Sequence, residues 1–275
     1  MIDPARVALF VTPGLSRAKA AVFARIGASI QARGGRIVVH DYAKLAALPD
    51  EIIPIVGASP ELKPIIDGWR ARGRHRIQWD RGYLRRFGAT WLPRGPLPGG
   101  YYRWHVDAFQ AQSIRDVPGD RWRRLVDGNP HDPRPLQVMP WQRGGTDIVI
   151  AANSAVYVKS HGLETWLGDT MATLRGHTDR PIRVRAKDAA TPLQDDLANA
   201  HCLVTHGSIA AVEAVVLGCP VFVSSDSAAA MVGKTDLREI EAPAYPERDA
   251  WLRSLAYDQF TQDEITDGTL WKWIN

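Results

Sequence analysis

The chain has 275 residues, of which 45% are hydrophobic and 23% charged, with a formal net charge of +4 and a pI of about 9.2. This length allows one or two domains with a large core, and its two cysteines, Cys202 and Cys219, exclude a disulfide framework and favour a reducing compartment. The N-terminus has no basic region followed by a long apolar run, and no stretch of about 18 apolar residues occurs, so we expect a soluble, cytoplasmic protein rather than a secreted or membrane-spanning one.

Strands and helices alternate along the first part of the chain. Apolar runs and helical spacing predict strands over residues 6–11, 36–40, 52–56 and 76–79, and helices over residues 16–31 and 61–72. Such alternation predicts a mainly parallel sheet. Residues 87–143 interrupt the alternation with many prolines and glycines, and we expect them to contain the junction between two halves.

Regular alternation resumes after that stretch. We expect a strand over residues 146–151, a helix near 162–175, a strand over 181–185, a short helix over 193–200 and a strand, turn, helix and strand over 202–223. The final residues have a helical pattern, with Trp251, Leu252, Leu255 and Trp271 as apolar anchors. The sequence therefore predicts an α/β fold with two Rossmann-like halves, residues 1–140 and 141–246, and a helical tail, residues 247–275.

The stretch 202–223 is the most informative for function. Its turn contains Gly207, which lets backbone approach a ligand, and Ser208, which can cap the following helix while its hydroxyl and the free N–H groups face an anion. Glu213 lies in that helix among small and apolar residues, where a lone acid needs hydroxyl or N–H partners such as those of a ribose. The pattern favours a nucleotide that carries a diphosphate.

These residues resemble the C-terminal donor-binding domain of GT-B glycosyltransferases, which include capsule-polysaccharide and Kdo-type transferases, and of the related UDP-N-acetylglucosamine 2-epimerases. The matching positions are Thr205, Ser208, Glu213, Ala214, Gly218, Pro220 and Val221. The turn departs from many relatives in having one glycine instead of two, and in having His206. The alternative is an ordinary βαβ unit in which the glycines and the proline only end the elements.

The resemblance implies a GT-B-like fold with an interdomain cleft and a C-terminal helix that crosses back to the first half. It also implies a nucleotide-sugar donor bound by the second half. The residues expected to bind this donor are Lys187, Thr205, His206, Gly207, Ser208 and Glu213.

Lys187 is included because it ends the strand 182–187, and open α/β sheets bind ligands at the carboxyl ends of their strands. Its cation could neutralise phosphate charge. Capsule-type transferases resemble this arrangement, although their usual His-Pro is absent and Asp188 follows instead. Arg183 in the same strand is equally compatible with a solvated edge. Asn153 and Ser154 follow another strand and could contact the donor or form a plain turn.

The first half must supply the acceptor site and, if the reaction inverts, a general base. Asp80 is the leading candidate because it ends an apolar strand, so that its carboxylate would point into the interdomain cleft and accept a hydroxyl proton. A salt bridge between Asp80 and an arginine is the alternative. His105 and Asp107 are further candidates for the base. The expected acceptor-binding residues are Arg81, Tyr83, Tyr102, Arg103 and Trp104.

Alternation along residues 101–107 predicts two different faces. Tyr102, Trp104 and Val106 should share one face, and Arg103, His105 and Asp107 should share the other. Each of the polar residues could equally be paired within the protein.

Residues 63–143 are basic, with 16 Lys and Arg against 7 Asp and Glu, and they include six tryptophans: Trp69, Trp79, Trp91, Trp104, Trp122 and Trp141. Basic groups can follow a phosphate backbone while aromatic rings stack on bases, or the same groups can bind an anionic polysaccharide. A surface rich in arginine with buried tryptophans is the alternative. No zinc-finger, helix-turn-helix or RNP signature accompanies the region.

The whole chain also resembles a poorly characterised family of phage and prophage proteins. The resemblance is carried by the segments 80–83, 101–103, 178–182, 204–208 and 255–260. It implies a protein acting in the cytoplasm of a bacterial host. Together with the basic charge, it suggests DNA modification, in which a sugar is added to hydroxymethylated pyrimidines of phage DNA.

Three functions remain open at this point. The first is a metal-independent glycosyltransferase that uses a nucleotide sugar as co-substrate and no other cofactor. DNA is its candidate acceptor. The second is an epimerase or hydrolase acting on the nucleotide sugar, and the third is a non-catalytic nucleic-acid-binding protein on the same fold. The eight histidines form no metal-ligand spacing, and the sequence has no Asp-x-Asp, P-loop or G-x-S-x-G motif.

Overall fold

The computed structural model describes residues 2–12, 17–39, 41–84, 100–128 and 135–274. The chain divides into two compact units. The first contains Met1–Phe109 and Tyr257–Asn275, and the second contains Gln110–Ala256. Residue 140, where the sequence places the end of the first half, lies inside the second unit.

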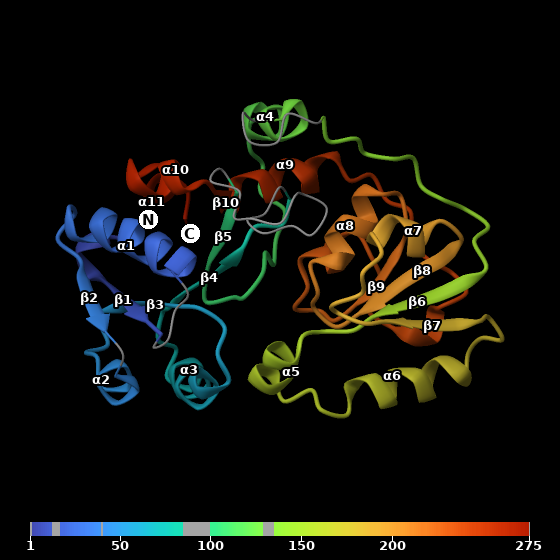
Figure 1. The fold of residues 1–275 in the computed structure, drawn as a ribbon, viewed down its shortest axis with the longest axis horizontal. Coiled ribbons are helices and arrows are strands. Elements are labelled where there is room, and N and C mark those ends of the chain that lie inside the picture. Colours follow the sequence, from blue (N-terminus) through green and yellow to red (C-terminus); the bar gives the residue numbers. More distant parts are fainter. Residues whose placement is uncertain (1, 13–16, 40, 85–99, 129–134, 275) are drawn as a thin grey trace. The chain divides into compact units, whose positions relative to one another are not determined.

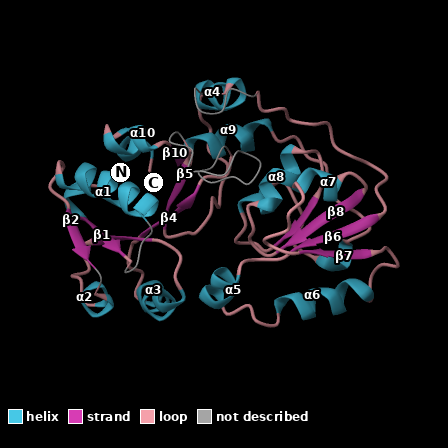
Figure 2. Ribbon diagram, in the orientation of Figure 1, coloured by secondary structure: helices cyan, strands magenta, loops and turns pink. Residues whose placement is uncertain are grey.

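The first unit is built on a six-stranded sheet of order β10-β5-β4-β3-β1-β2 (Figures 1 and 2). Its strands are β1 (Val7–Val11), β2 (Arg36–Val39), β3 (Ile53–Val56), β4 (Ile77–Arg81), β5 (Tyr102–Val106) and β10 (Gln259–Phe260). The first four strands are parallel, β5 runs antiparallel to β4, and β10 runs antiparallel to β5. Since β10 comes from the C-terminal segment, this segment completes the first sheet.

Helices cover both faces of this sheet (Figure 1). They are α1 (Arg17–Gln31), α2 (Tyr42–Ala46), α3 (Lys63–Ala71), α10 (Gln262–Thr266) and α11 (Thr269–Trp273). Helices α1, α10 and α11 pack on one face around Leu9, Ile55 and Ile77, and α2 and α3 pack on the other around Phe10 and Val56. Apolar strand residues therefore face helices on both sides, as in parallel sheets generally.

The second unit has a four-stranded parallel sheet of order β7-β6-β8-β9. Its strands are β6 (Asp147–Ala151), β7 (Ile182–Arg185), β8 (Ala200–Thr205) and β9 (Val221–Val223). Its helices are α4 (Asp120–Asp127), α5 (Ala155–His161), α6 (Trp166–Arg175), α7 (Leu193–Leu197), α8 (Ala210–Val216) and α9 (Asp249–Tyr257). Helix α9 ends on Tyr257, the first residue of the C-terminal segment. Figure 1 shows α6 on one face of this sheet and α7 and α8 on the other.

The strand order creates a switch point in the second sheet. The chain passes from β6 to β7 on one side and then crosses to β8 on the other side of β6. The connections that leave β6 and β8 therefore go to opposite faces, and a crevice between them is the usual ligand site in such sheets.

The expected α/β class with mainly parallel sheets is confirmed. Two local expectations need correction. The helix expected near residues 162–175 is α6, which begins at Trp166, and it is preceded by α5, a helix that was not expected and that ends where Gly162 takes a left-handed conformation with φ 67°. The C-terminal tail is not wholly helical, because β10 interrupts it. None of the helices in the described ranges is long and apolar enough to cross a membrane.

Candidate functional site

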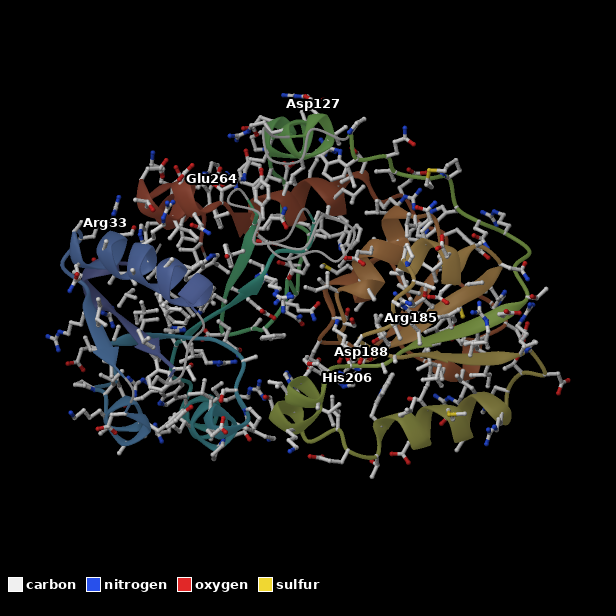
Figure 3. All side chains as sticks on the ribbon, viewed as in Figure 1. Arg33, Asp127, Arg185, Asp188, His206 and Glu264 are labelled. Atoms are coloured by element: carbon white, nitrogen blue, oxygen red, sulfur yellow. The ribbon has the colours of Figure 1, made fainter. Side chains whose placement is uncertain are left out.

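Polar side chains gather at the carboxyl ends of the second sheet. Because its four strands are parallel, the residues that follow them lie at one edge. The residues that follow the strands include Asn153 and Ser154 after β6, Lys187 after β7, His206 and Ser208 after β8, and Ser224 after β9. Figure 3 shows the labelled His206 and Asp188 at this edge. The sequence therefore placed the expected donor residues at the ends of neighbouring strands.

Lys187 and Ser208 are brought into contact there. The Nζ atom of Lys187 lies 3.4 Å from the hydroxyl of Ser208, although 21 residues separate them. The same hydroxyl accepts a hydrogen bond of 3.3 Å from the N–H of Ala210, the first residue of α8. Ser208 therefore supports the start of the helix. The contact gives the edge a cation beside a hydroxyl group.

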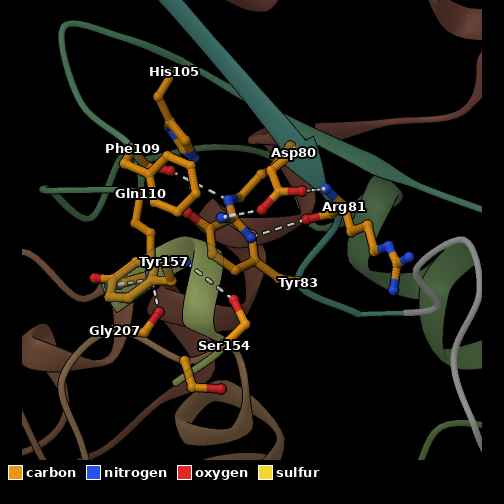
Figure 4. A network of polar contacts seen from close by, with 12 residues as sticks. Asp80, Arg81, Tyr83, His105, Phe109, Gln110, Ser154, Tyr157 and Gly207 are labelled. Carbon is orange, nitrogen blue, oxygen red and sulfur yellow. Dashed lines mark hydrogen bonds and ion pairs between the residues drawn. The ribbon is translucent and has the colours of Figure 1, made fainter. Parts of the chain in front are cut away.

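Thr205 and Gly207 have structural roles that the sequence did not predict. The hydroxyl of Thr205 is buried and donates a 2.7 Å hydrogen bond to the carbonyl of Ala151, which ties the end of β8 to that of β6. A Cβ atom on Gly207 would lie 2.1 Å from the hydroxyl oxygen of Tyr157. The close approach that requires glycine is therefore made by Tyr157 in this structure, and the expected approach of a ligand stays a prediction. The Gly207 carbonyl accepts a 2.6 Å bond from Gln110 (Figure 4).

His206 is half-buried beside rings from α5 and α6. The hydroxyl of Tyr157 lies 3.1 Å from its Nδ1 atom, and the ring of Trp166 meets it edge-on with centroids 6.1 Å apart. Burial lowers the pKa of His206, the nearby His161 lowers it further, and Asp226 opposes this shift. The imidazole is therefore biased toward its neutral form, which has one donor and one acceptor nitrogen.

Asn153 and Glu213 are two further polar residues of the expected donor region. The amide Nδ2 of Asn153 is buried without a hydrogen-bond partner among the residues that the structure describes, so it is a donor that a ligand could satisfy. Glu213 lies partly buried within α8. Its expected contact with a ribose stays a prediction.

The arginines of β7 are engaged within the protein. Arg183 forms an ion pair of 2.8 Å with Asp147 and lies 3.6 Å from Asp196, which also pairs with Arg185. Arg183 therefore lies on an edge strand, as the alternative had it, and its guanidinium is paired with carboxylates. Lys187, which follows this strand, contacts the hydroxyl of Ser208.

In the first unit, Asp80 forms an ion pair with Arg103 (Figure 4). The Oδ2 and Nη2 atoms are 3.1 Å apart, and the side chains are 40% and 2% exposed respectively. The other carboxylate oxygen accepts a 2.8 Å bond from the N–H of Arg81. The salt-bridge alternative is therefore present, while the catalytic role of Asp80 stays a prediction.

Other candidate residues of the first unit lie in buried contacts. The Tyr83 hydroxyl is 2.7 Å from Nε2 of His105, and the guanidinium of Arg103 lies over the Tyr83 ring at 5.5 Å and the Phe109 ring at 4.6 Å. Arg103 also donates to the carbonyls of Arg81 and Phe109 at 3.0 and 3.2 Å. These contacts explain how polar side chains are accommodated in the interior.

The alternation expected along β5 is confirmed. Tyr102, Trp104 and Val106 pack in one apolar cluster with Trp79, whose ring centroid is 5.6 Å from those of Tyr102 and Trp104. Burial raises the pKa of Tyr102 to about 12. The positions of Tyr102 and Trp104 favour packing over acceptor binding.

Asp107 lies at the other end of β5 from Arg103. Because β5 is antiparallel to β4, this is the amino-terminal end of β4, whereas Asp80 lies near its carboxyl end. Asp107 accepts a 2.9 Å bond from the N–H of Arg76 and lies 2.6 Å from Nδ1 of His75. Its backbone is left-handed, with φ 59°. The geometry thus assigns Asp107 to a turn away from the edge where Asp80 lies.

Much of the basic and aromatic stretch is interior. Four of its arginines are buried and donate to backbone carbonyls: Arg74, Arg76, Arg103 and Arg121. Three of its tryptophans are buried: Trp69, Trp79 and Trp104. Trp91 lies outside the described residues. These positions favour the alternative of buried tryptophans, and these seven side chains are not available to stack on bases or bind phosphates.

Within the described parts of the chain, no three His, Cys, Asp or Glu residues lie close enough together to hold a metal ion. Both cysteines are buried, and they form no disulfide bond. Burial raises the pKa of the Cys219 thiol to about 12.

The solved structures that resemble the chain include two Kdo transferases. A Thermosulfurimonas dismutans KpsC, beta Kdo 2,7 transferase, has a TM-score of 0.51 and 12% sequence identity, and the match covers 96% of this chain and 99% of that one. A Thermosulfurimonas dismutans KpsC, beta Kdo 2,4 transferase, has a TM-score of 0.46 and 12% identity, with 92% and 91% coverage. No protein-family model and no curated protein sequence matches. The first likeness supports a two-domain, GT-B-like fold, whereas the resemblance to phage proteins stays a prediction.

Proposed function

We propose that the chain is a metal-independent glycosyltransferase that binds a nucleotide-activated sugar at the carboxyl edge of its second sheet. The observation that carries this proposal is the contact between Lys187 and Ser208, at the edge where the strand order of the sheet switches. The GT-B-like fold, shared with a Kdo transferase, supports the same reading.

The groups at this edge suit a nucleotide phosphate. Lys187 supplies positive charge, Ser208 supplies a hydroxyl group, and the buried amide of Asn153 supplies a further donor. Such groups can stabilise the negative charge that develops on the phosphate when the sugar leaves, without a metal ion. Glu213 is proposed to accept hydrogen bonds from ribose hydroxyls.

Transfer requires that an acceptor oxygen bonds to the anomeric carbon while the bond to the phosphate oxygen breaks. The acceptor hydroxyl must then lose a proton, and in an inverting reaction a carboxylate can accept it. Of the three candidate bases, Asp80 is partly exposed and lies near the carboxyl end of its strand. His105 is buried, and Asp107 lies at the opposite end of the strand pair. We therefore retain Asp80 as the proposed base.

The acceptor is either a saccharide or hydroxymethylated DNA. A saccharide is supported by the similar fold of a Kdo transferase. DNA was suggested by the basic stretch and the phage resemblance, but the burial of Arg74, Arg76, Arg103 and Arg121 removes part of that support. The expected cytoplasmic location stays a prediction, and action in a bacterial host belongs to the DNA alternative.

Product analysis by mass spectrometry tests the proposal. The full chain would be incubated with UDP, GDP, CMP and dTDP sugars, with a panel of oligosaccharides and hydroxymethylated DNA, and without acceptor. Transfer that requires an acceptor, and that falls in Lys187→Met but not in Lys44→Met, is the expected result. Lys44 is a matched control because its side chain is 77% exposed in the first unit and makes a surface ion pair with Asp41.

Two other results would contradict the proposal that the chain is a transferase. Sugar release or epimerisation at the same rate without acceptor would indicate the epimerase or hydrolase alternative. DNA binding without any nucleotide binding would indicate the non-catalytic alternative, and Glu213→Ala would then change nothing.

A further inference from the structure

The rings of Tyr157 and Trp166, which follow β6 in the chain, lie beside His206. The hydroxyl of Tyr157 contacts a ring nitrogen of His206. Tyr157 and His161 both lie on α5, where their rings stack with centroids 3.9 Å apart and planes at 20°. The hydroxyl of Tyr157 reaches Nδ1 of His206 at 3.1 Å, and the two ring centroids are 5.9 Å apart. The loop after β8 is thus linked to the helix after β6, the two connections that bound the switch point.

The chemistry of the two groups sets the direction of this hydrogen bond. A phenol O–H is a stronger acid than the N–H of a neutral imidazole, and an imidazole nitrogen is a better acceptor than a phenol oxygen. The favoured arrangement therefore has Tyr157 donating and Nδ1 of His206 accepting. The remaining ring hydrogen is then on Nε2, because a neutral imidazole carries one hydrogen on nitrogen.

We propose that Tyr157 is a positioning residue of the donor site: it holds His206 as the tautomer with hydrogen on Nε2, which donates that hydrogen to a phosphate oxygen of the bound nucleotide sugar. The inference rests on the proposed function, because it assigns a ligand to the same edge. It adds a role for a residue that lies 49 positions before His206 in the sequence.

The main chain beside the histidine is matched to the tyrosine. At Gly207, an added Cβ atom would lie 2.1 Å from the Tyr157 hydroxyl oxygen and 3.0 Å from the ring carbon that bears it. Moving the ring would also disturb its stacking on His161. Glycine at this position therefore leaves the space in which the hydroxyl reaches His206, and alanine should displace it.

Nuclear magnetic resonance on the full chain tests the tautomer directly. The protein would be labelled with nitrogen-15 in histidine, and the His206 signals would be assigned by their loss in His206→Gln. We expect Nδ1 without hydrogen and Nε2 with hydrogen in the native protein, and a mixture of tautomers in Tyr157→Phe and Gly207→Ala. Tyr245→Phe is the matched control, because Tyr245 lies in the same unit and contacts Trp141 and Arg143 instead.

Adding the nucleotide that stabilises the protein completes the test. The Nε2–H signal should shift on binding, and Tyr157→Phe should weaken binding about threefold to tenfold, the usual effect of one misplaced hydrogen bond. Hydrogen on Nδ1 in the native protein, unchanged tautomers in Tyr157→Phe, or an Nε2–H signal that does not respond to bound nucleotide would overturn the inference. If none of the nucleotides binds, the proposed function itself fails, and this result is distinct from the tautomer measurement.

Discussion

The ion pair between the partly exposed Asp80 and the buried Arg103 leads to an asymmetric prediction. Arg103→Met removes a guanidinium that is 2% exposed and keeps an apolar side chain of similar length. Asp80→Asn removes only the charge of a carboxylate that is 40% exposed, and its amide oxygen can still accept from the N–H of Arg81. We expect the first change to cost much more stability than the second.

The contacts of Arg103 set the magnitude. The substitution removes hydrogen bonds to Asp80, to the carbonyl of Arg81 and to the carbonyl of Phe109, and each contributes about 1 kcal/mol. It also removes the two contacts with aromatic rings, at roughly 0.5–1 kcal/mol each. We therefore expect Arg103→Met to lower the free energy of unfolding by about 4–5 kcal/mol. Asp80→Asn should cost about 1 kcal/mol, since solvent screens the exposed carboxylate.

Urea unfolding measures both changes. Tryptophan fluorescence is a suitable probe because Trp79 and Trp104 are buried in the same unit as the ion pair. A loss below about 1 kcal/mol for Arg103→Met, or an equal loss for the two variants, would refute the account of this cluster. The proposed role as base adds a separate expectation: Asp80→Asn should reduce transfer by about a hundredfold or more while the protein stays folded.

Three further predictions concern the buried polar contacts. Thr205→Val should lower the free energy of unfolding in urea by about 1–2 kcal/mol, because the carbonyl of Ala151 loses its buried donor. The control Thr173→Val removes an exposed hydroxyl from α6 and should cost less than about 0.5 kcal/mol. Equal costs would contradict the role of Thr205. Ser29→Ala should cost about 1 kcal/mol by the same assay, since the buried Ser29 hydroxyl donates to the carbonyl of Ile265 in the C-terminal segment, and no loss would contradict that anchoring role. Stability should also fall as the pH drops below about 6.5, because the pKa of His206 is lowered in the folded protein and the unfolded chain takes up the proton first. His206→Gln should reduce the difference between unfolding curves at pH 7.5 and pH 5.5, and an unchanged difference would exclude His206 as its source.

Local patterns predicted much of the fold because the spacing of apolar residues reflects which face is buried. The alternation over residues 101–107 correctly separated Tyr102, Trp104 and Val106 from their neighbours. The ends of parallel strands meet at one edge, so Lys187 and Ser208 could be grouped from sequence alone.

Partners that are distant in the chain could not be predicted in this way. Tyr157 lies in a helix that was not expected, and nothing near it in the sequence indicates a contact with His206. Likewise, the arginines of the basic stretch give no local sign of whether they face solvent or a buried carbonyl. Arg74 and Arg121 are buried because backbone carbonyls from other segments accept their hydrogen bonds, a result of tertiary packing.

Thermal unfolding with added nucleotide is the most direct test of the donor site. Native protein, Lys187→Met, Ser208→Ala and the control Lys44→Met would be heated with UDP, GDP, CMP and dTDP and their sugars, each against its own unliganded melting temperature. A ligand at a hundred times its dissociation constant stabilises the native state by about 2.7 kcal/mol. The account predicts that one nucleotide raises the melting temperature of the native protein and of Lys44→Met, with a smaller rise in the two site variants. If no nucleotide raises it, or if all four proteins respond equally, the carboxyl edge of the second sheet is not the donor site.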